Sequence, residues 1–380
     1  MQKVAFLTGT RADYGKLKAL MQVLAESESF DVQVLVTGMH LLPQYGMTVS
    51  QIINDNIGTV HLIPNNTTSQ TMESTLSKTI EQLAAFLEHN KMDLLIIHGD
   101  RIEALAGAIV GSLRNLPTAH IEGGEVSGTV DGLIRHSISK LAHLHFVSNE
   151  TAKNRVIQLG EREDSIYVIG SPDVDVMLSN KLPSMSEVIN RYKIPFDEYA
   201  IAIFHPVTNE ISTLKNQIVQ FCNALQESSE NYIIIKPNND LGTEIIQEEL
   251  SKLDSKSKFL HVPSMRFEFF LTLLKNSKFI IGNSSAGVRE ASYFGVPAIN
   301  VGSRQKNRNS NALILNSTVE CADLLIAIAK ARTLDRKNIF DFGEGEASVK
   351  FLEVLQADSF WPVSIEKEFV DLFDAEGRSI

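Results

Sequence analysis

Cysteine is nearly absent from this sequence. Of its 380 residues only Cys222 and Cys321 are cysteines, and their spacing forms neither a disulfide framework nor a metal-ligand motif. Both lie in apolar, helix-like stretches, which favours their interpretation as small buried hydrophobic residues. We therefore expect a reduced, cytoplasmic protein. Because the His and acidic residues are spread over separate predicted strand ends and form no metal-ligand constellation, we also expect no metal ion or other cofactor.

Long apolar runs and an excess of positive charge are also missing. No run of about 18 apolar residues suggests a membrane span, and the amino-terminal MQKVAFLTGT lacks the apolar core of a signal peptide. The net charge of −11 argues against broad binding to nucleic acid or to an anionic membrane. An anionic small ligand stays compatible with this charge, because a single pocket can still be basic.

The familiar nucleotide-binding loops do not occur either. There is no GxGxxG motif and no P-loop, but an apolar strand at residues 4–7 runs into the turn TGTRADYG and then into a helix. Backbone N–H groups at such a helix start suit a phosphate, and Arg11 could add a bidentate contact. The alternative is a plain strand-to-helix turn.

Short apolar runs alternate with amphipathic helical patterns along the whole chain. Residues 94–97 form such a run, as expected of a parallel strand buried on both faces, and residues 71–90 carry apolar side chains at helical spacing. The same alternation resumes after residue 199. It predicts an α/β protein with two doubly wound parallel sheets.

The length of the chain predicts more than one domain, because a single core rarely serves 380 residues. The turn GSPD at residues 170–173 and the mixed, polar segment after it mark a boundary. We predict an amino-terminal domain over residues 1–170, a carboxyl-terminal domain over residues 171–355 and a tail over residues 356–380. A cleft between two such halves is the natural place for a ligand.

Polar clusters follow two neighbouring predicted strands in the first half. The strand at residues 94–97 ends in HGDR, and the strand at residues 117–121 ends in HIEGGE. Ligands of open α/β sheets bind at the carboxyl ends of strands, so Asp100 and Glu122 are expected to face one cleft, with Asp131 within reach. Neighbouring carboxylates push each other's pKa values apart, which suits one as a base and another as an acid. Alternatively, these acids are helix N-caps or solvated loop charges.

The second half carries a pattern typical of anion binding. A strand at residues 279–281 ends in GNSSAG, and hydroxyl side chains at the following helix start offer donors to a phosphate. Ser284 or Ser285 could equally be a simple N-cap. Glu290, further along, could accept from ribose hydroxyls. His205, at another strand end, could donate to a phosphate or leaving-group oxygen, or have only a structural role.

Six segments together resemble one enzyme family. They read TGTRADYGKL, HGDR, HIEGGEVSGTVDGLIRH, FHPVT, IGNSSAGVREA and FGVPAINVGSRQ, and the likeness extends to about residue 355. The family is that of the UDP-N-acetylglucosamine (UDP-GlcNAc) 2-epimerases. The wording HIEGGE…SGT…D is most similar to the hydrolysing branch, the NeuC-type enzymes that begin sialic acid biosynthesis.

The resemblance implies a GT-B fold, in which two Rossmann-like domains hold the nucleotide in the cleft between them. It implies hydrolysis of UDP-GlcNAc to N-acetylmannosamine (ManNAc) and UDP, with inversion at C2. The family route is an anti elimination of UDP to 2-acetamidoglucal, followed by addition of water across the double bond. A homo-oligomer, a dimer or a tetramer, is also implied.

Carried over by motif, three carboxylates and one histidine would be catalytic: Asp100, Glu122, Asp131 and His205. Glu122 and Asp131 would share proton removal at C2 and activation of water, and Asp100 would orient or protonate. His205, together with Arg11, would stabilise the departing phosphate. The substrate-binding residues implied by the same motifs are Arg11, Lys16, Arg101, His120, Asn238, Ser284, Ser285, Gly287, Glu290 and Arg304.

Four alternatives remain open at this point. The same mechanism could act on UDP-2,4-diacetamido-2,4,6-trideoxyglucose in legionaminic acid synthesis, because the pocket near sugar C4 and C6 cannot be identified from one sequence. A non-hydrolysing epimerase would keep its product linked to UDP. A GT-B glycosyltransferase would not need the carboxylates at the strand ends. A binding protein for nucleotide sugars would have no catalytic turnover, so substitution of these carboxylates could not abolish any.

Overall fold

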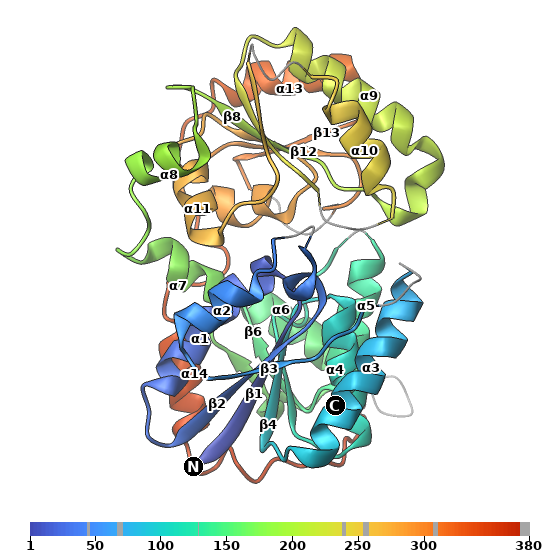
Figure 1. Ribbon diagram of the computed structural model, residues 1–380, viewed down its shortest axis with the longest axis vertical. Coiled ribbons are helices and arrows are strands. Elements are labelled where there is room, and N and C mark those ends of the chain that lie inside the picture. Colours follow the sequence, from blue (N-terminus) through green and yellow to red (C-terminus); the bar gives the residue numbers. More distant parts are fainter. Residues whose placement is uncertain are drawn as a thin grey trace. The chain divides into compact units, whose positions relative to one another are not determined.

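The computed structural model describes residues 1–43, 46–66, 71–127, 129–237, 241–253, 258–306 and 311–372. These residues form two compact units, each built around its own sheet (Figure 1). Unit 1 contains Met1–Glu125, Asp131–Leu178 and the chain from Phe342 onward, and unit 2 contains Val126–Val130 and Ser179–Asp341. Within the described part of the chain, no helix combines the length and the apolar character needed to cross a bilayer.

The described residues of unit 1 form a seven-stranded parallel sheet in the order β3-β2-β1-β4-β5-β6-β7. Its strands are β1 (Gln2–Thr8), β2 (Phe30–Val36), β3 (Thr59–Leu62), β4 (Leu94–His98), β5 (Thr118–Ile121), β6 (Leu144–Val147) and β7 (Ile166–Val168). Its helices are α1 (Arg11–Ala25), η1 (Gly38–Leu41), α2 (Val49–Asp55), α3 (Met72–His89), α4 (Ile102–Leu113), α5 (Val130–Leu141), α6 (Glu150–Gln158), η3 (Glu163–Ser165), α7 (Pro172–Leu178) and α14 (Ala347–Gln356). The strand order reverses between β1 and β4, and such a switch point is where open α/β sheets bind ligands.

The described residues of unit 2 repeat this plan with a six-stranded parallel sheet in the order β10-β9-β8-β11-β12-β13. Its strands are β8 (Ala200–Ile203), β9 (Tyr232–Ile235), β10 (Phe259–Val262), β11 (Ile280–Gly282), β12 (Ala298–Val301) and β13 (Ile314–Ser317). Its helices are α8 (Met185–Tyr192), η4 (Thr208–Glu210), α9 (Ile211–Glu227), α10 (Thr243–Leu250), α11 (Phe267–Lys275), η5 (Ser285–Gly287), α12 (Glu290–Tyr293) and α13 (Cys321–Ala331). Its switch point lies between β8 and β11.

The two sheets are buried on both faces, as their near-continuous apolar strands predict. In β1, Val4, Ala5 and Phe6 have no exposed surface, although their side chains alternate between the two faces. Helices cover both sides of the sheet of unit 1 (Figure 1). The predicted α/β class with two doubly wound parallel sheets is therefore confirmed.

The unit boundaries differ from those that we predicted. Unit 1 continues past residue 170 to Leu178 and takes the chain back at Phe342, whereas we assigned residues 171–355 to the second domain. The reason is α14, which lies beside α1 (Figure 1) and places Phe351 in the core of unit 1. Asp175 on α7 fixes the start of α14, because its carboxylate accepts from the N–H groups of Ala347 and Ser348 at 2.8 and 2.7 Å.

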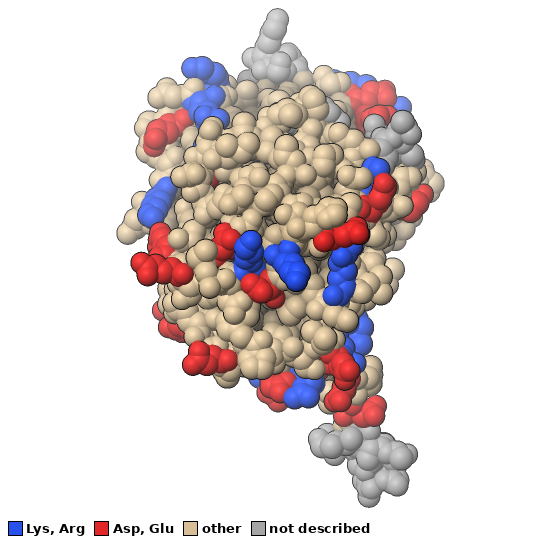
Figure 2. Space-filling view, turned by 60° about the horizontal axis from the view of Figure 1, so that its bottom comes forward, with Lys and Arg blue, Asp and Glu red and all other residues tan. Residues whose placement is uncertain are grey.

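Charged side chains of both signs share the molecular surface. On the face drawn in Figure 2, Lys and Arg side chains lie next to Asp and Glu side chains, surrounded by uncharged residues. This face therefore offers solvent a mixed rather than a uniformly basic surface.

Candidate active site

The turn between β1 and α1 is organised by Asp13. Its carboxylate accepts from the N–H groups of Gly9, Thr10 and Tyr14 at 2.9, 2.9 and 2.7 Å, and from the Thr8 hydroxyl at 2.9 Å. These amides point at a side chain of the protein, so the turn does not present them to a phosphate as we had considered. The geometry is that of a strand-to-helix turn closed by a capping box.

Arg135 joins Asp100 and Glu122, the two acidic residues that we predicted at neighbouring strand ends, by contacting the side chain of the first and the backbone of the second. The arginine side chain is only 1% exposed. One nitrogen, Nη2, forms an ion pair with Asp100, just past the end of β4. The other, Nη1, donates to the carbonyl oxygen of Glu122 at 2.9 Å. Arg135 on α5 therefore holds the turns after β4 and β5 together, and it places Asp100 and Glu122 at the same edge of the sheet.

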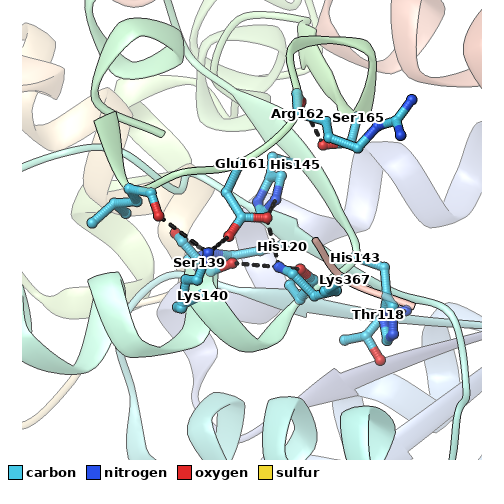
Figure 3. A network of polar contacts seen from close by, with 12 residues as sticks. Thr118, His120, Ser139, Lys140, His143, His145, Glu161, Arg162, Ser165 and Lys367 are labelled. Atoms are coloured by element: carbon cyan, nitrogen blue, oxygen red, sulfur yellow. Dashed lines mark hydrogen bonds and ion pairs between the residues drawn. The ribbon is translucent and has the colours of Figure 1, made fainter. Parts of the chain in front are cut away.

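His120, a buried residue of β5, also holds the turn after β4 in place. It has no exposed surface, and its Nε2 atom lies 2.7 Å from the Gly99 carbonyl oxygen. Its Nδ1 atom lies 3.0 Å from the hydroxyl of Ser139, which is labelled together with His120 in Figure 3. Burial lowers the pKa of His120 to about 3, so the ring is neutral, and Nε2 can donate while Nδ1 accepts. We expected a substrate-binding residue here. With both ring nitrogens engaged inside the fold, His120 instead positions the Gly99 turn.

Glu122 adopts an unusual backbone conformation for its residue type. Its φ angle is +63°, in the left-handed region, and its side chain is almost fully buried. The backbone is held there because its N–H donates to Phe146 at 2.9 Å and its carbonyl accepts from Arg135. Residues other than Gly, Asn and Asp rarely adopt a positive φ. The backbone strain of such a conformation is found most often at functional sites.

Four buried side chains, from β4, α1, α7 and the residue before α7, surround the Glu122 carboxylate. His98 Nε2, at the end of β4, lies 3.2 Å from Oε2, and Lys16 Nζ, on α1, lies 3.7 Å from the same atom. Lys16 is closer still to Asp173 on α7, at 2.9 Å. The hydroxyl of Ser171 donates to Oε1 of Glu122. We call these five residues the Glu122 cluster. A carboxylate with one lysine, one imidazole and one hydroxyl around it can accept and release a proton.

The remaining predicted residues of unit 1 lie on elements that begin at this edge of the sheet. Arg11 opens α1, and Asp131 lies in the first turn of α5, part-buried. Arg101 precedes α4, and its Nε atom lies 3.9 Å from the Glu103 carboxylate on that helix.

In unit 2, Asn283 ties together the two strands at the switch point. Its side chain accepts from the N–H of His205 at 2.7 Å and donates to the carbonyl of His205 at 2.8 Å. Gly282 makes this approach possible, since its φ is +137° and an added Cβ would lie 1.8 Å from the Ile203 carbonyl oxygen. The ends of β8 and β11 thereby place His205 beside the Ser284–Ser285 turn.

The segment after β11 is a short 3₁₀ turn rather than the start of a longer helix. Ser284 caps η5, and its hydroxyl accepts from the N–H of Ala286 at 3.3 Å. Ser285 and Gly287 lie within η5. Glu290 follows as the first residue of α12 and is buried. We had expected these hydroxyl residues to stand at the start of a helix, and the four-residue α12 is too short to supply a helix-end phosphate site by itself.

Arg304 reaches the same turn from the loop after β12. Its Nη1 atom donates to the carbonyl of Asn283 at 3.2 Å, and Gln305 donates to that carbonyl at 3.1 Å. His205, Ser284, Ser285 and Arg304 are thus brought to one edge of this sheet. Asn238, the other predicted residue of unit 2, lies outside the described residues.

The described residues contain no group of three or more His, Cys, Asp or Glu side chains arranged to hold a metal ion. The chemistry at the edge of unit 1 is that of carboxylates, a lysine and histidines, and the edge of unit 2 supplies hydroxyls, a histidine and an arginine.

Comparison with known proteins decides the family. The model of the UDP-N-acetylglucosamine 2-epimerase family matches residues 22–356. The chain belongs to this family. The UDP-N-acetylglucosamine 2-epimerase of Neisseria meningitidis serogroup B is 44% identical over 376 residues, which cover 98% of this chain and 100% of the relative.

The names of other similar proteins specify another sugar substrate or a biosynthetic pathway. The UDP-N,N'-diacetylbacillosamine 2-epimerase (hydrolyzing) of Legionella pneumophila is 34% identical over 94% of this chain and 96% of its own length. The polysialic acid biosynthesis protein P7 of Escherichia coli is 36% identical over 84% of this chain and 83% of its own length.

Solved epimerase structures share the fold. The enzyme of Methanocaldococcus jannaschii, solved in complex with UDP-GlcNAc and UDP, aligns with a TM-score of 0.81 at 21% identity over 93% of this chain and 99% of its own. A Neisseria meningitidis epimerase, solved bound to UDP-GlcNAc, aligns with a TM-score of 0.79 at 19% identity over the same shares of the two chains. The predicted GT-B architecture is therefore confirmed at the level of the fold.

Three residues of this epimerase-family site were not predicted from the sequence. His98 was visible in the HGDR motif, but only Asp100 and Arg101 were taken from it. Ser171 and Asp173 were interpreted only as part of the turn that marks the boundary between two domains. The signal that could have found them is the spacing S-P-D at the end of a parallel strand, the position where ligands of α/β sheets bind.

Proposed function

We propose that the protein is a hydrolysing UDP-GlcNAc 2-epimerase, which converts UDP-GlcNAc and water to ManNAc and UDP. The observation that carries this proposal is the Glu122 cluster. A strained, buried carboxylate lies 3.2 Å from an imidazole at the carboxyl edge of the sheet, beside the Asp100–Arg135 pair. Inversion at C2 requires removal of a weakly acidic proton, and a general base contributes about 10²- to 10⁴-fold to such a step.

In the proposed mechanism Glu122 takes the proton from C2 while the bond from C1 to the UDP oxygen breaks, giving 2-acetamidoglucal. Asp131, at the start of α5, shares proton transfer and activates the water that then adds at C1. Asp100, fixed by Arg135, orients the sugar or returns a proton. Pre-positioned charge of this kind acts without reorganisation at the moment of reaction.

The proposed role of unit 2 is to bind UDP. His205 and Arg304 would neutralise the departing diphosphate, with Arg11 of unit 1, and Ser284 and Ser285 would donate to its oxygens. Glu290 would accept from the ribose hydroxyls. The support is the convergence of His205 and Arg304 on Asn283, through hydrogen bonds of 2.7 to 3.2 Å.

The hydrolysing branch is favoured by the HIEGGE…SGT…D segment and by two relatives. The Legionella relative carries the word hydrolyzing in its name, and the Escherichia coli relative is named for polysialic acid biosynthesis. We infer that ManNAc made by this protein feeds sialic acid synthesis.

The second candidate is the same reaction on a UDP-linked 2,4-diacetamido-2,4,6-trideoxy sugar. The observation that favours it is the 34% identity to the Legionella enzyme that is named for such a substrate. The 44% identity to the Neisseria enzyme over the whole chain favours UDP-GlcNAc.

The two candidates are separated by measuring kcat/KM for both sugar nucleotides and identifying the products by NMR. The proposal predicts free ManNAc and UDP, and a preference for UDP-GlcNAc of at least about tenfold. A preference for the trideoxy sugar would assign the second candidate. Accumulation of UDP-ManNAc as the end product would contradict hydrolysis. Glu122→Gln is the matched control, and it should bind UDP but turn over neither substrate.

A further inference from the structure

The chain segment after β7 takes a route that its sheet position does not require. Strand β7 is the edge strand, four places from β1 in the order β1-β4-β5-β6-β7. Neighbouring strands lie about 4.8 Å apart, so about 19 Å separate the two strands. Yet α7 packs on α1, which follows β1. The chain therefore crosses back over the carboxyl edge of the sheet directly after β7.

This crossing delivers two fully buried polar side chains to Glu122. Ser171 and Asp173 have no exposed surface. Ser171 donates to Oε1 of Glu122, and Asp173 lies 2.9 Å from Lys16 Nζ, which is 3.7 Å from Oε2 of Glu122. The lysine is thus shared unequally between two carboxylates, and it lies nearer to Asp173.

We propose that Ser171 and Asp173 are positioning residues of the epimerase site: Ser171 fixes one oxygen of Glu122, and Asp173 holds Lys16 so that the other oxygen can accept a proton. The inference rests on the proposed function in one respect, namely that Glu122 is the base that acts on the substrate.

The two residues act on the basicity of Glu122 in opposite directions. A hydrogen bond to the charged carboxylate stabilises the charged form, so loss of the Ser171 hydroxyl makes Glu122 a stronger base. Loss of the Asp173 charge removes a like charge and releases Lys16 to pair with Glu122, which makes Glu122 a weaker base. A residue needed only for packing would produce no such opposed pair of effects.

Other charged or titratable groups face Glu122 from the neighbouring elements. His98 approaches Oε2 from β4, Lys16 approaches from α1, and Arg135 of α5 donates to the backbone carbonyl while it pairs with Asp100. His98 and Arg135 keep these contacts in both variants and set a common background, whereas Lys16 keeps its partner in Ser171→Ala and loses Asp173 in Asp173→Asn.

The test is the pH profile of kcat/KM for UDP-GlcNAc. We expect Ser171→Ala to move its acidic limb up by about one pH unit and Asp173→Asn to move it down by about one unit. Ser171→Thr keeps the hydroxyl and should restore the wild-type limb. Asp175→Asn is the matched control on the same helix, because Asp175 caps α14 instead of facing Glu122. It should lower thermal stability and leave the limb in place.

Unmoved limbs, or limbs that move in the same direction in Ser171→Ala and Asp173→Asn, would overturn the inference. If Asp173→Asn does not fold, the Ser171→Ala and Ser171→Thr pair still decides, because an unmoved limb in Ser171→Ala contradicts the role of the hydroxyl.

A second readout does not depend on turnover. In protein labelled with carbon-13 at the glutamate carboxyl, the Glu122 resonance is the one that Glu122→Gln removes. Its titration midpoint should rise in Ser171→Ala and fall in Asp173→Asn. If wild-type protein leaves UDP-GlcNAc unchanged, the proposed function fails while this titration still decides the inference. If wild-type protein turns over and the midpoints stay fixed, only the inference fails.

Discussion

At the scale of single residues, the candidate site depends on side chains that hold other side chains or backbone in place. Arg135 spans the turns after β4 and β5, His120 holds the Gly99 carbonyl, and Asn283 holds both backbone groups of His205. Each is nearly inaccessible to solvent. Hydrogen bonds between buried polar groups fix geometry, and removal of one partner costs about 1–3 kcal/mol per group left unpaired.

The substitution Asn283→Asp tests this at unit 2. A carboxylate can accept from the His205 N–H but cannot donate to the His205 carbonyl, so the two oxygens repel and His205 moves. We expect the affinity for UDP, measured by titration calorimetry, to fall at least about tenfold, which corresponds to about 1.4 kcal/mol.

The control for this variant is Asn231→Asp, because Asn231 donates to the Glu198 carbonyl at the opposite end of the strands. It should leave UDP affinity unchanged. Wild-type affinity in a folded Asn283→Asp protein would mean that His205 does not contribute to the UDP site.

At the scale of elements, burial rather than distance decides what an ion pair contributes. Glu161, before β7, accepts from Lys367 Nζ at 2.6 Å, from Lys140 at 2.9 Å and from His145 at 3.1 Å (Figure 3). Burial raises its pKa, but these hydrogen bonds outweigh burial and bring it to about 2. Arg162 and Asp164, close by in sequence, also approach to 2.6 Å, but both side chains are more than half exposed.

The Glu161→Gln substitution is therefore expected to lower the free energy of unfolding of unit 1 by about 3 kcal/mol, because it removes the buried counter-charge of the part-buried Lys367. Asp164→Asn, at the exposed pair, should change it by less than about 1 kcal/mol. Urea unfolding followed by the fluorescence of Trp361, the single tryptophan of the chain, reports on unit 1, where that side chain packs on Phe30 and Phe360. Equal losses for the two variants would contradict the account.

Some elements could be predicted from the sequence and others could not. The strand predicted over residues 94–97 is β4, which ends one residue later at His98, because an apolar run bounded by polar residues is a local signal. The return of α14 to unit 1 was missed, because its apolar stripe would fit either sheet. Helix α8 carries a capping box from Ser184 to Glu187 that we overlooked in a polar segment. Strand β13 was missed because Asn316 and Ser317 interrupt its apolar run.

At the scale of the whole molecule, the strand order determines which predicted residues meet. The motifs placed Asp100 and Glu122 at one sheet edge, and the structure joins them through Arg135. Ser171 and Asp173 were missed, because the S-P-D spacing marks the end of a strand but does not show that the chain then crosses back to Glu122. In the turn at Asp13 the sequence pattern was misleading. Its backbone N–H groups, which we considered for phosphate binding, donate instead to the carboxylate of Asp13 on the following helix.

Unit 1 as a whole should lose stability in mild acid. His120, His143 and His145 are buried, and burial lowers the pKa of each ring, to about 3 for His120 and about 4 for His143. The unfolded chain binds protons near the ordinary value of 6.5, so the stabilisation is complete above pH 6.5 and is lost as the pH falls toward 4.

Each such histidine contributes a slope of about 1.4 kcal/mol per pH unit to the free energy of unfolding. Urea unfolding followed by Trp361 fluorescence between pH 7 and 4.5 should show this decline, and His143→Gln should reduce the slope. His89→Gln, on the exposed end of α3, should leave it unchanged. A stability that is flat over this range would show that the rings are not held neutral.

The measurement that tests the central claim most directly is the reaction of the protein with UDP-GlcNAc in D₂O, followed by proton NMR. Removal of the C2 proton by Glu122, loss of UDP and addition of water predict free ManNAc that carries deuterium at C2, together with an equal amount of UDP. ManNAc that retains the original proton at C2, or UDP release with free GlcNAc as the only sugar, would contradict proton removal at C2 and with it the role assigned to the Glu122 cluster.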